Sequence, residues 1–317
     1  MRKGAEMTTI RAHCFERGVQ RYQDITSMQN AFLSLHLSIL LAGTTGVFGK
    51  LIALSPMMIV WWRALIAGFV LLVLVRYKKL FERCSTKEVF KYLLLGVILA
   101  YQWMLFYASI KASNISVGVV TFSTVGFFTA ILEPLILKSR FSVRELLLSL
   151  LTILGVFLIF QFDARYRLGI CYGVLSAAGA SLVAIFMKAF RREHNAPTVL
   201  IWQFIGAFIG SCALLPVYFW WMPESAFMPP TVTDAVNLLI FATVVTLGMY
   251  LLQMVAFRHI SAFTVNLSYN LEPVYSILIA IIFLGEAKEL NFGFWMGLSL
   301  IASSVILQTI CVMRERK

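Results

Sequence analysis

Charged residues are scarce in this 317-residue sequence, at 13% of the chain, and the 15 Asp and Glu are outnumbered by 27 Lys and Arg. Soluble globular chains carry about one quarter charged residues, so this deficit excludes an ordinary soluble domain. The five cysteines and four histidines are scattered, without the spacing of a disulfide framework or a metal site. We therefore expect no bound metal and no cofactor.

Sequence motifs for catalysis are also missing. No G-x-x-x-x-G-K-[ST] loop and no nucleophile elbow occurs, which argues against ATP hydrolysis by this chain. A membrane-embedded enzyme would need groups converging at one depth, and Glu133 and Glu272 fall at different depths. The net charge of +12 would suggest nucleic acid in a soluble protein, but here the basic residues lie between apolar runs. We expect neither an enzyme nor a nucleic-acid partner.

Long apolar runs dominate the sequence, which is 60% hydrophobic and has a mean hydropathy of +0.84. Ten runs are long enough to cross a hydrocarbon core of ~30 Å. The connections between them are short, leaving no room for a soluble domain. The sequence predicts an all-α integral membrane protein with ten transmembrane helices near 32–52, 57–76, 90–110, 115–137, 144–162, 168–188, 198–220, 234–257, 262–284 and 291–312.

Lysines and arginines are distributed unevenly among the connections. If the N-terminus is cytoplasmic, most of the 27 fall on the cytoplasmic side, and the outer connections hold only Lys50, Lys111, Arg165, Arg167 and Lys288. This bias predicts a multi-pass protein of the cell (cytoplasmic or inner) membrane with both termini in the cytoplasm. Residues 1–31 are then a flexible N-terminal tail, and residues 313–317 a short C-terminal tail.

A weak internal repeat divides the chain into residues 32–162 and 168–312. Sliding the sequence by 147 residues aligns spans three to five with spans eight to ten, and pairs Trp103 with Tyr250. Each half holds five spans, an odd number, so the second half must enter the membrane with the opposite orientation. The pattern predicts two inverted five-helix repeats with a substrate site near mid-depth between them.

Ionisable residues inside the spans are the first candidates for function, because charge in a bilayer is expensive. Glu272 and Pro273 interrupt the ninth span, where the acid could couple protons and the proline bends the helix. Arg63 lies in the second span, where it either snorkels, pairs structurally or recognises an anion. Lys50 ends the first span and either snorkels or takes part in gating. Glu133, near the end of the fourth span, is interpreted as a local surface pair with Lys138.

Aromatic and amide side chains deep in the spans are the candidates for solute binding. We expect a cavity lined by spans one, three, four, six, eight and nine, because polar side chains in lipid-buried helices either join helices or face a wet space. Aromatic rings with a polar edge suit an amphipathic or cationic solute. The candidates are Trp103, Tyr107, Thr121, Tyr250, Gln253, Asn266, Tyr269 and Asn270.

Three segments resemble the EamA-type transporters of the drug/metabolite transporter superfamily. They are L-E-P-V-Y-S-I-L-I-A-I-I-F-L-G-E at 271–286, W-W-R-A-L-I-A-G at 61–68 and G-T-T-G-V-F-G-K at 43–50. In the 147-residue register, Gly126 and Ser139 stand where the second half has Pro273 and Glu286, so the Gly-Glu ending occurs only once. The resemblance implies ten helices and export or exchange of small metabolites, driven by gradients rather than ATP.

The sequence thus predicts a secondary-active transporter that exports or exchanges a small amino-acid-like or amphipathic solute by alternating access, with proton coupling through Glu272 as one mechanism. One alternative is a carrier or flippase of a sugar-phosphate or polyprenyl-linked substrate, which would need Arg63, Lys50 or Lys188 to face the cavity. Another is a non-transporting membrane sensor or partner protein, whose centre would be filled with apolar side chains. We expect the lipid bilayer and a small-molecule substrate as partners, and a monomer or a homodimer.

Overall fold

The computed structural model describes residues 28–160, 166–190, 193–272, 275, 279 and 292–314. Within the described residues the first helix runs from Met28 to Leu51, with a turn at Thr44 before α2 (Thr45–Leu51). The described residues contain no β-strand, so the predicted all-helical class is confirmed for them. The other elements are α3 (Pro56–Tyr77), α4 (Thr86–Ala112), α5 (Ile115–Phe122), α6 (Val125–Leu137), α7 (Val143–Phe160), α8 (Arg167–Phe190), α9 (Ala196–Trp221), α10 (Val232–Ile240), η2 (Phe241–Leu247), α11 (Gly248–Ala256), α12 (Ala262–Ser268), η3 (Tyr269–Leu271) and α14 (Phe292–Arg314).

Seven helices within the described residues are long and apolar enough to cross a membrane. They are Met28–Leu51, Pro56–Tyr77, Thr86–Ala112, Val117–Leu137, Arg167–Phe190, Ala196–Trp221 and Val232–Ala256, each within a few residues of a predicted span. Helix α7 is not among them over its described residues, and the apolar stretch Trp295–Cys311 of α14 is shorter. Much of the predicted ninth span lies outside the described residues. The total of ten spans therefore stays a prediction.

Capping side chains fix the starts of six helices among the described residues. Each capping residue precedes the first helical residue, and its side-chain oxygen accepts a hydrogen bond from the backbone N–H three positions later. At Ser85 the arrangement is reciprocal, because Glu88 accepts from the Ser85 backbone N–H at 2.6 Å. The capping residues are Ser55, Ser85, Asn114, Asn195, Thr231 and Ser261.

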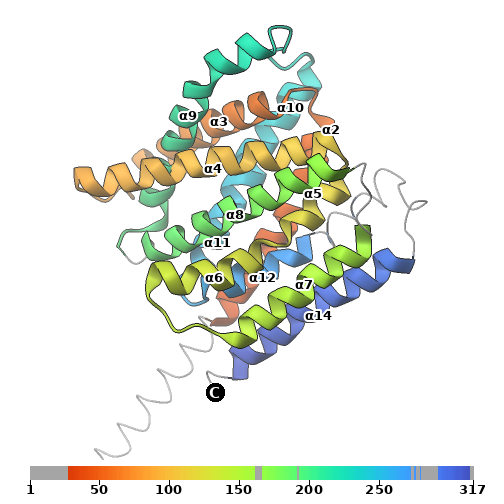
Figure 1. The fold of residues 1–317 in the computed structure, drawn as a ribbon. Coiled ribbons are helices and arrows are strands. Elements are labelled where there is room, and N and C mark those ends of the chain that lie inside the picture. Colours follow the sequence, from red (N-terminus) through yellow and green to blue (C-terminus); the bar gives the residue numbers. More distant parts are fainter. Residues whose placement is uncertain are drawn as a thin grey trace, which may run out of the picture.

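Helix α4 lies at the centre of the packing, with α8 on one side and α9 on the other (Figure 1). Two glycines allow α4 and α9 to cross with backbone contact. A Cβ atom on Gly96 would lie 2.0 Å from the Gln203 carbonyl oxygen, and one on Gly206 would lie 2.1 Å from the Leu93 carbonyl oxygen. Only glycine fits at either position. Small residues at helix crossings are the usual route to tight packing in membranes.

Helices α7 and α14 form a pair at the lower edge of the bundle in Figure 1. Thr152 and Ser304 join them through a hydrogen bond of 3.0 Å between two buried hydroxyls. Helix α6 packs against α8 and α12, nearer the centre. The pair is therefore peripheral, while α4, α8 and the broken helices surround the middle of the molecule.

Two helices, belonging to the predicted fourth and ninth spans, are interrupted within the described residues. The helix that starts at Ile115 is interrupted after Phe122, and the helix that starts at Ala262 tightens into the 3₁₀ turn η3 from Tyr269. The two starts lie 147 residues apart, the offset at which the sequence pairs Trp103 with Tyr250. Broken helices expose backbone groups, which membrane proteins tolerate only where protein or a cavity covers them.

The role expected for Glu133 is wrong. Its side chain is buried instead of lying in a surface pair with Lys138. The carboxylate accepts hydrogen bonds from the backbone N–H groups of Ala262 at 3.3 Å and Phe263 at 2.8 Å. It therefore caps α12 from α6, where a negative charge also complements the positive end of the helix dipole. Local spacing on one helix could not reveal a partner 130 residues away.

Candidate functional site

A cavity of about 80 Å³ lies among the first helix, α3, α4, α5, α6, α8, α11 and α12 with η3. All six predicted spans contribute to it, and α3 contributes as well through Arg63. Among the predicted functional residues, those that line it are Arg63, Trp103, Tyr107, Tyr250, Gln253, Asn266, Tyr269 and Glu272. A space of this size and polarity can hold several water molecules. The cavity brings together a cation, a carboxylate, three amides and several aromatic rings.

Arg63 is a cation enclosed by the protein, with only 1% of its side chain exposed. Its Nε donates to Thr246 Oγ1 at 2.6 Å, and its Nη1 donates to the Tyr107 hydroxyl at 2.9 Å. The guanidinium carbon lies 3.8 Å from the ring centroid of Trp103 and 4.5 Å from that of Phe241. Cation–π contacts and neutral hydroxyls thus hold Arg63 in the interior.

Thr246 belongs to η2, a π-helical segment inside the helix that runs from α10 to α11. Its hydroxyl donates to the Phe241 carbonyl five residues earlier at 2.8 Å, while accepting from Arg63. A π-helical segment adds a residue to the helical turn, and such segments recur at functional sites. Sequence reasoning missed Thr246, because a lone threonine in an apolar run has no distinguishing signal.

Trp103 of α4 and Tyr250 of α11 contact each other at the edge of the cavity. The Trp103 indole N–H donates to the Tyr250 hydroxyl at 3.1 Å, and the ring centroids lie 5.8 Å apart in an edge-to-face arrangement. Phe204 of α9 packs behind both rings. These two residues are the pair that the 147-residue offset aligns. They form one wall of the cavity next to Arg63.

Glu272 follows directly after the 3₁₀ turn η3 and is 4% exposed. Its hydrogen bond within the described residues is a long one, in which Thr45 Oγ1 donates to Oε1 at 3.5 Å. The carboxylate therefore has weak local support compared with Glu133, which accepts from two backbone N–H groups. A buried acid with few protein donors remains available for a proton or for a ligand.

The polar residues before Glu272 are tied to neighbouring helices. Asn266 donates from Nδ2 to Thr129 Oγ1 of α6 at 2.8 Å. The Tyr269 hydroxyl is hydrogen-bonded to Ser38, which also donates to the Met249 carbonyl at 2.8 Å. Asn266 and Tyr269 therefore join helices and also line the cavity.

Thr121 lies outside the cavity lining, so its placement does not support the predicted binding role. Its hydroxyl donates to the Val117 carbonyl at 2.6 Å in its own helix. The side chain packs against Gly173 of α8, where an added Cβ would lie 1.9 Å from Thr121 Oγ1. The residue therefore serves a close contact between α5 and α8 rather than the solute space.

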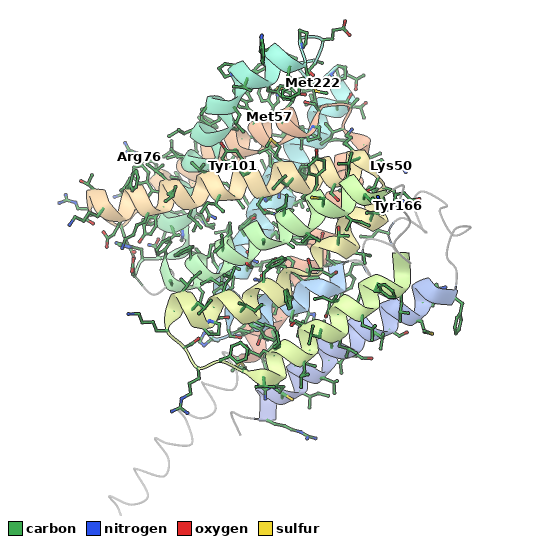
Figure 2. The ribbon with its side chains drawn as sticks, viewed as in Figure 1. Lys50, Met57, Arg76, Tyr101, Tyr166 and Met222 are labelled. Atoms are coloured by element: carbon green, nitrogen blue, oxygen red, sulfur yellow. The ribbon has the colours of Figure 1, made fainter. Side chains whose placement is uncertain are left out.

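Lys50 also lies outside the lining. It is exposed at the C-terminal end of α2, at the right-hand edge of Figure 2, while Arg76 is at the opposite edge. Asn270 is in η3, but its side chain is not among those described, and Pro273 lies outside the described residues. The predicted roles of Asn270 and Pro273 stay predictions.

Several lining residues were not predicted from the sequence. Thr45 and Gln102 add polar groups, and the rest are apolar: Ala42, Phe106, Phe122, Val125, Ala180, Val183, Ala184, Met187 and Met249. In a protein that is 60% hydrophobic, an apolar residue facing a cavity looks the same in sequence as one facing lipid. The resulting walls are mainly apolar, with polar groups concentrated at Arg63 and Glu272.

A second polar cluster lies at the start of α4. The ligand-type atoms of Glu88, Glu193 and His194 are within 4.8 Å of one another. Glu88 is engaged in the Ser85 capping box, while the Tyr92 hydroxyl is hydrogen-bonded to Glu193 at 3.3 Å and to His194 at 2.8 Å. These contacts account for the cluster as a structural network between α4 and the α8–α9 connection.

Comparisons with known proteins show which protein family this sequence matches. The family model described as the EamA-like transporter family matches residues 29–161 and 167–310. An uncharacterized transporter of Haemophilus influenzae is 29% identical over 160 residues, which are 48% of this chain and 52% of that protein. The match thus spans about half the length of that relative.

Two further matches extend over most of the chain. An uncharacterized transporter of Clostridium kluyveri is 23% identical over 279 residues, covering 83% of this chain and 88% of that protein. A protein of known crystal structure superposes with a TM-score of 0.68 at 14% identity, covering 89% of this chain and 98% of that one. At that identity the superposition establishes a shared fold and nothing finer.

Proposed function

Because the chain belongs to the EamA-like transporter family, we propose that this multi-pass membrane protein is a secondary-active carrier of a small metabolite. Its substrate is an amino-acid-like or amphipathic solute, which it exports or exchanges by alternating access through the central cavity. The observation that carries the proposal is the cavity itself, where Arg63 and Glu272 lie buried among membrane helices. Charges are kept at this depth at a cost, and solute binding is a reason to keep them.

The proposed architecture has ten transmembrane helices in two inverted halves, residues 32–162 and 168–312. It is supported by the two separate family matches and by the two broken helices that start 147 residues apart. The location of the substrate site between the halves agrees with the contact of Trp103 with Tyr250. Alternating access then consists of the two halves exchanging conformations around a fixed site.

The proposed location is the cell (cytoplasmic or inner) membrane, with both termini in the cytoplasm. The bias of lysine and arginine among the connections supports this orientation. Labelling of single cysteines introduced at Tyr77 and Lys111 tests it, since the two lie at opposite ends of the bundle's long helices. A membrane-impermeant thiol reagent applied to intact cells should modify the Lys111 position and leave the Tyr77 position unmodified.

Proton coupling is proposed to act through Glu272. Within the described residues the Glu272 carboxylate is held by one long hydrogen bond, from Thr45, so it can be neutralised there without unfolding a helix. Proton binding would remove the negative charge from the cavity and so change its affinity for the solute. The coupling would be lost if the acid were replaced by an amide of the same shape.

The test uses the full chain in liposomes that contain the pH-sensitive dye pyranine. Amino acids are added one at a time, and solute-dependent proton movement is compared between wild type and Glu272→Gln. We expect the variant to lose the proton signal, and any exchange of labelled solute that remains at high solute concentration to be independent of pH. Glu133→Gln is the matched control, because Glu133 is also buried but serves α12. An unchanged proton signal in Glu272→Gln would eliminate the coupling role.

A further inference from the structure

Arg63 has hydrogen-bond capacity that the described residues do not use. A guanidinium group carries five N–H donors. One, on Nε, is directed to Thr246, and one, on Nη1, to Tyr107. The Nη2 atom is buried and has no hydrogen-bond partner among the described residues. Leaving buried donors unpaired is costly, so this arrangement is suited to a partner that arrives with the solute.

The direction from which that partner can approach is restricted. The rings of Trp103 and Phe241 lie 3.8 Å and 4.5 Å from the guanidinium carbon, so aromatic carbon occupies the space next to the group. The Nε donor of Arg63 is already used, because it donates to the Thr246 hydroxyl. The remaining donors are those of the Nη1 and Nη2 edge, which matches the two oxygens of a carboxylate in a bidentate pair.

Electrostatics favour an anion at this edge. Arginine stays protonated in proteins, and the hydrogen bonds of Arg63 within the described residues go to neutral hydroxyls. Glu272 lines the same cavity and is held by the Thr45 hydroxyl at 3.5 Å, so it is available to a cation. One cavity therefore presents a donor edge and a separate carboxylate.

We propose that Arg63 binds the carboxylate of the transported solute while Glu272 faces its ammonium group, so that the substrate is a small zwitterion of the α-amino-acid type. This inference rests on the proposed carrier function and specifies its substrate class. The solute's side chain lies against the apolar part of the wall, which includes Phe106, Val183 and Met249. Arg63 is then a substrate-binding residue rather than only a structural one.

A phosphate-bearing substrate fits the cavity less well. Of the three cations that this alternative calls on, Arg63 lines the cavity, whereas Lys50 and Lys188 are not among the lining residues. A dianion would need more than one cation. The Lys188 ammonium group instead donates to the Ile260 carbonyl at 2.6 Å. Glu272 would also repel a second negative charge. The structure thus favours a monocarboxylate over the sugar-phosphate and polyprenyl-phosphate alternatives.

The decisive experiment varies the solute and leaves the protein intact. Full-length wild-type protein in detergent is titrated with three series of probes. The first series is L-alanine, L-valine, L-leucine and L-phenylalanine. The second is the amide of each amino acid, and the third is the corresponding carboxylic acid without the α-amino group. Thermal stabilisation gives the relative Kd values. We expect at least one amino acid to bind, and its amide to bind about 10-fold to 100-fold more weakly, since a charge-assisted bidentate pair is lost. The acid without the amine should also bind more weakly, through loss of the Glu272 contact.

Variants then assign the effect to Arg63. In Arg63→Gln, which has no positive charge, the ratio between amino acid and amide should fall towards one. Arg63→Lys keeps the charge but not the planar fork, and should retain part of the discrimination. Arg144→Lys is the matched control, because Arg144 is a partly buried arginine of α7 that does not line the cavity. It should keep the full ratio.

Exchange in proteoliposomes separates the two levels of the proposal. If the amides bind and exchange as well as the free amino acids, the carrier function stands and the Arg63 inference is overturned. The inference is equally overturned if wild type and Arg63→Gln discriminate to the same extent. If no probe of the three series, and no solute of a mixed metabolite extract, exchanges faster than in protein-free liposomes, the carrier function is rejected and the inference with it.

Discussion

Gly206→Ala is predicted to destabilise the protein through the crossing of α4 and α9. The new methyl group would lie 2.1 Å from the Leu93 carbonyl oxygen and 2.7 Å from the Leu93 Cα, all of them backbone atoms. A flexible side chain could rotate away from such a contact, but a helix backbone cannot. The two helices would have to separate along their whole interface.

The magnitude follows from two opposing effects. Overpacking a tight interior contact costs about 1–3 kcal/mol and sometimes more. Replacing glycine by alanine within a helix contributes up to about 1 kcal/mol in the opposite direction. Gly68→Ala is the matched control, because its Cβ would meet the Phe204 Cβ at 3.5 Å and the Phe204 carbonyl carbon at 4.0 Å, both ordinary contacts. The control should therefore be neutral or slightly stabilising, while Gly206→Ala should lose about 1–2 kcal/mol net.

The assay is thermal unfolding of the purified chain in one detergent, with both variants heated at the same rate as wild type. A loss of 1 kcal/mol lowers Tm by about 2–4 °C in chains of 150–250 residues, and by about 2 °C in a chain of this length. We expect Tm to fall in Gly206→Ala and not in Gly68→Ala. Equal Tm values for the two variants would show that α4 and α9 do not cross at backbone contact.

Two further substitutions probe the supports of the cavity. Glu133→Ala should lower the free energy of unfolding by about 1–3 kcal/mol, because two backbone N–H groups of α12 lose their acceptor. Lys138→Ala should have little effect. Chemical denaturation in mixed micelles measures the unfolding free energy of both variants. Tyr250→Phe should cost about 0.5–1.5 kcal/mol through loss of the shared hydrogen bond. Trp103→Phe should cost more, because it also removes part of a buried ring that contacts Arg63. The double variant should cost clearly less than the sum, and full additivity would contradict a direct contact.

The positions of the membrane helices could be predicted from sequence because lipid imposes a simple requirement. Every backbone group in the hydrocarbon must be satisfied within the helix, so a span needs an uninterrupted apolar run of fixed length. The helices Pro56–Tyr77 and Ala196–Trp221 accordingly lie within two residues of their predicted ranges. The breaks after Phe122 and at Tyr269 were not predicted at these positions, since they depend on contacts between helices.

The cavity could be predicted in part, for the same physical reason. Polar residues such as Arg63 and Asn266 stand out in apolar runs, and the structure brings both to the cavity. The role predicted for Glu133 was wrong, and Thr121 lies away from the lining, because the face that a helix turns inward depends on which neighbour crosses it. Met249 was missed because apolar lining has no signature in an apolar chain.

The cap that Glu133 places on α12 has a mechanical consequence. Two backbone N–H groups of one broken helix are held by a side chain of the other, so α6 and the start of α12 are coupled as one stiff part. Any rearrangement that opened a path to the cavity between these segments would first have to strip a buried carboxylate of its donors. The first helix is joined to the same segment by hydroxyl hydrogen bonds, from Thr45 to Glu272 at 3.5 Å and between Ser38 and Tyr269. Under the proposed function, we therefore expect the solute to pass on the side of the first helix rather than between α6 and α12.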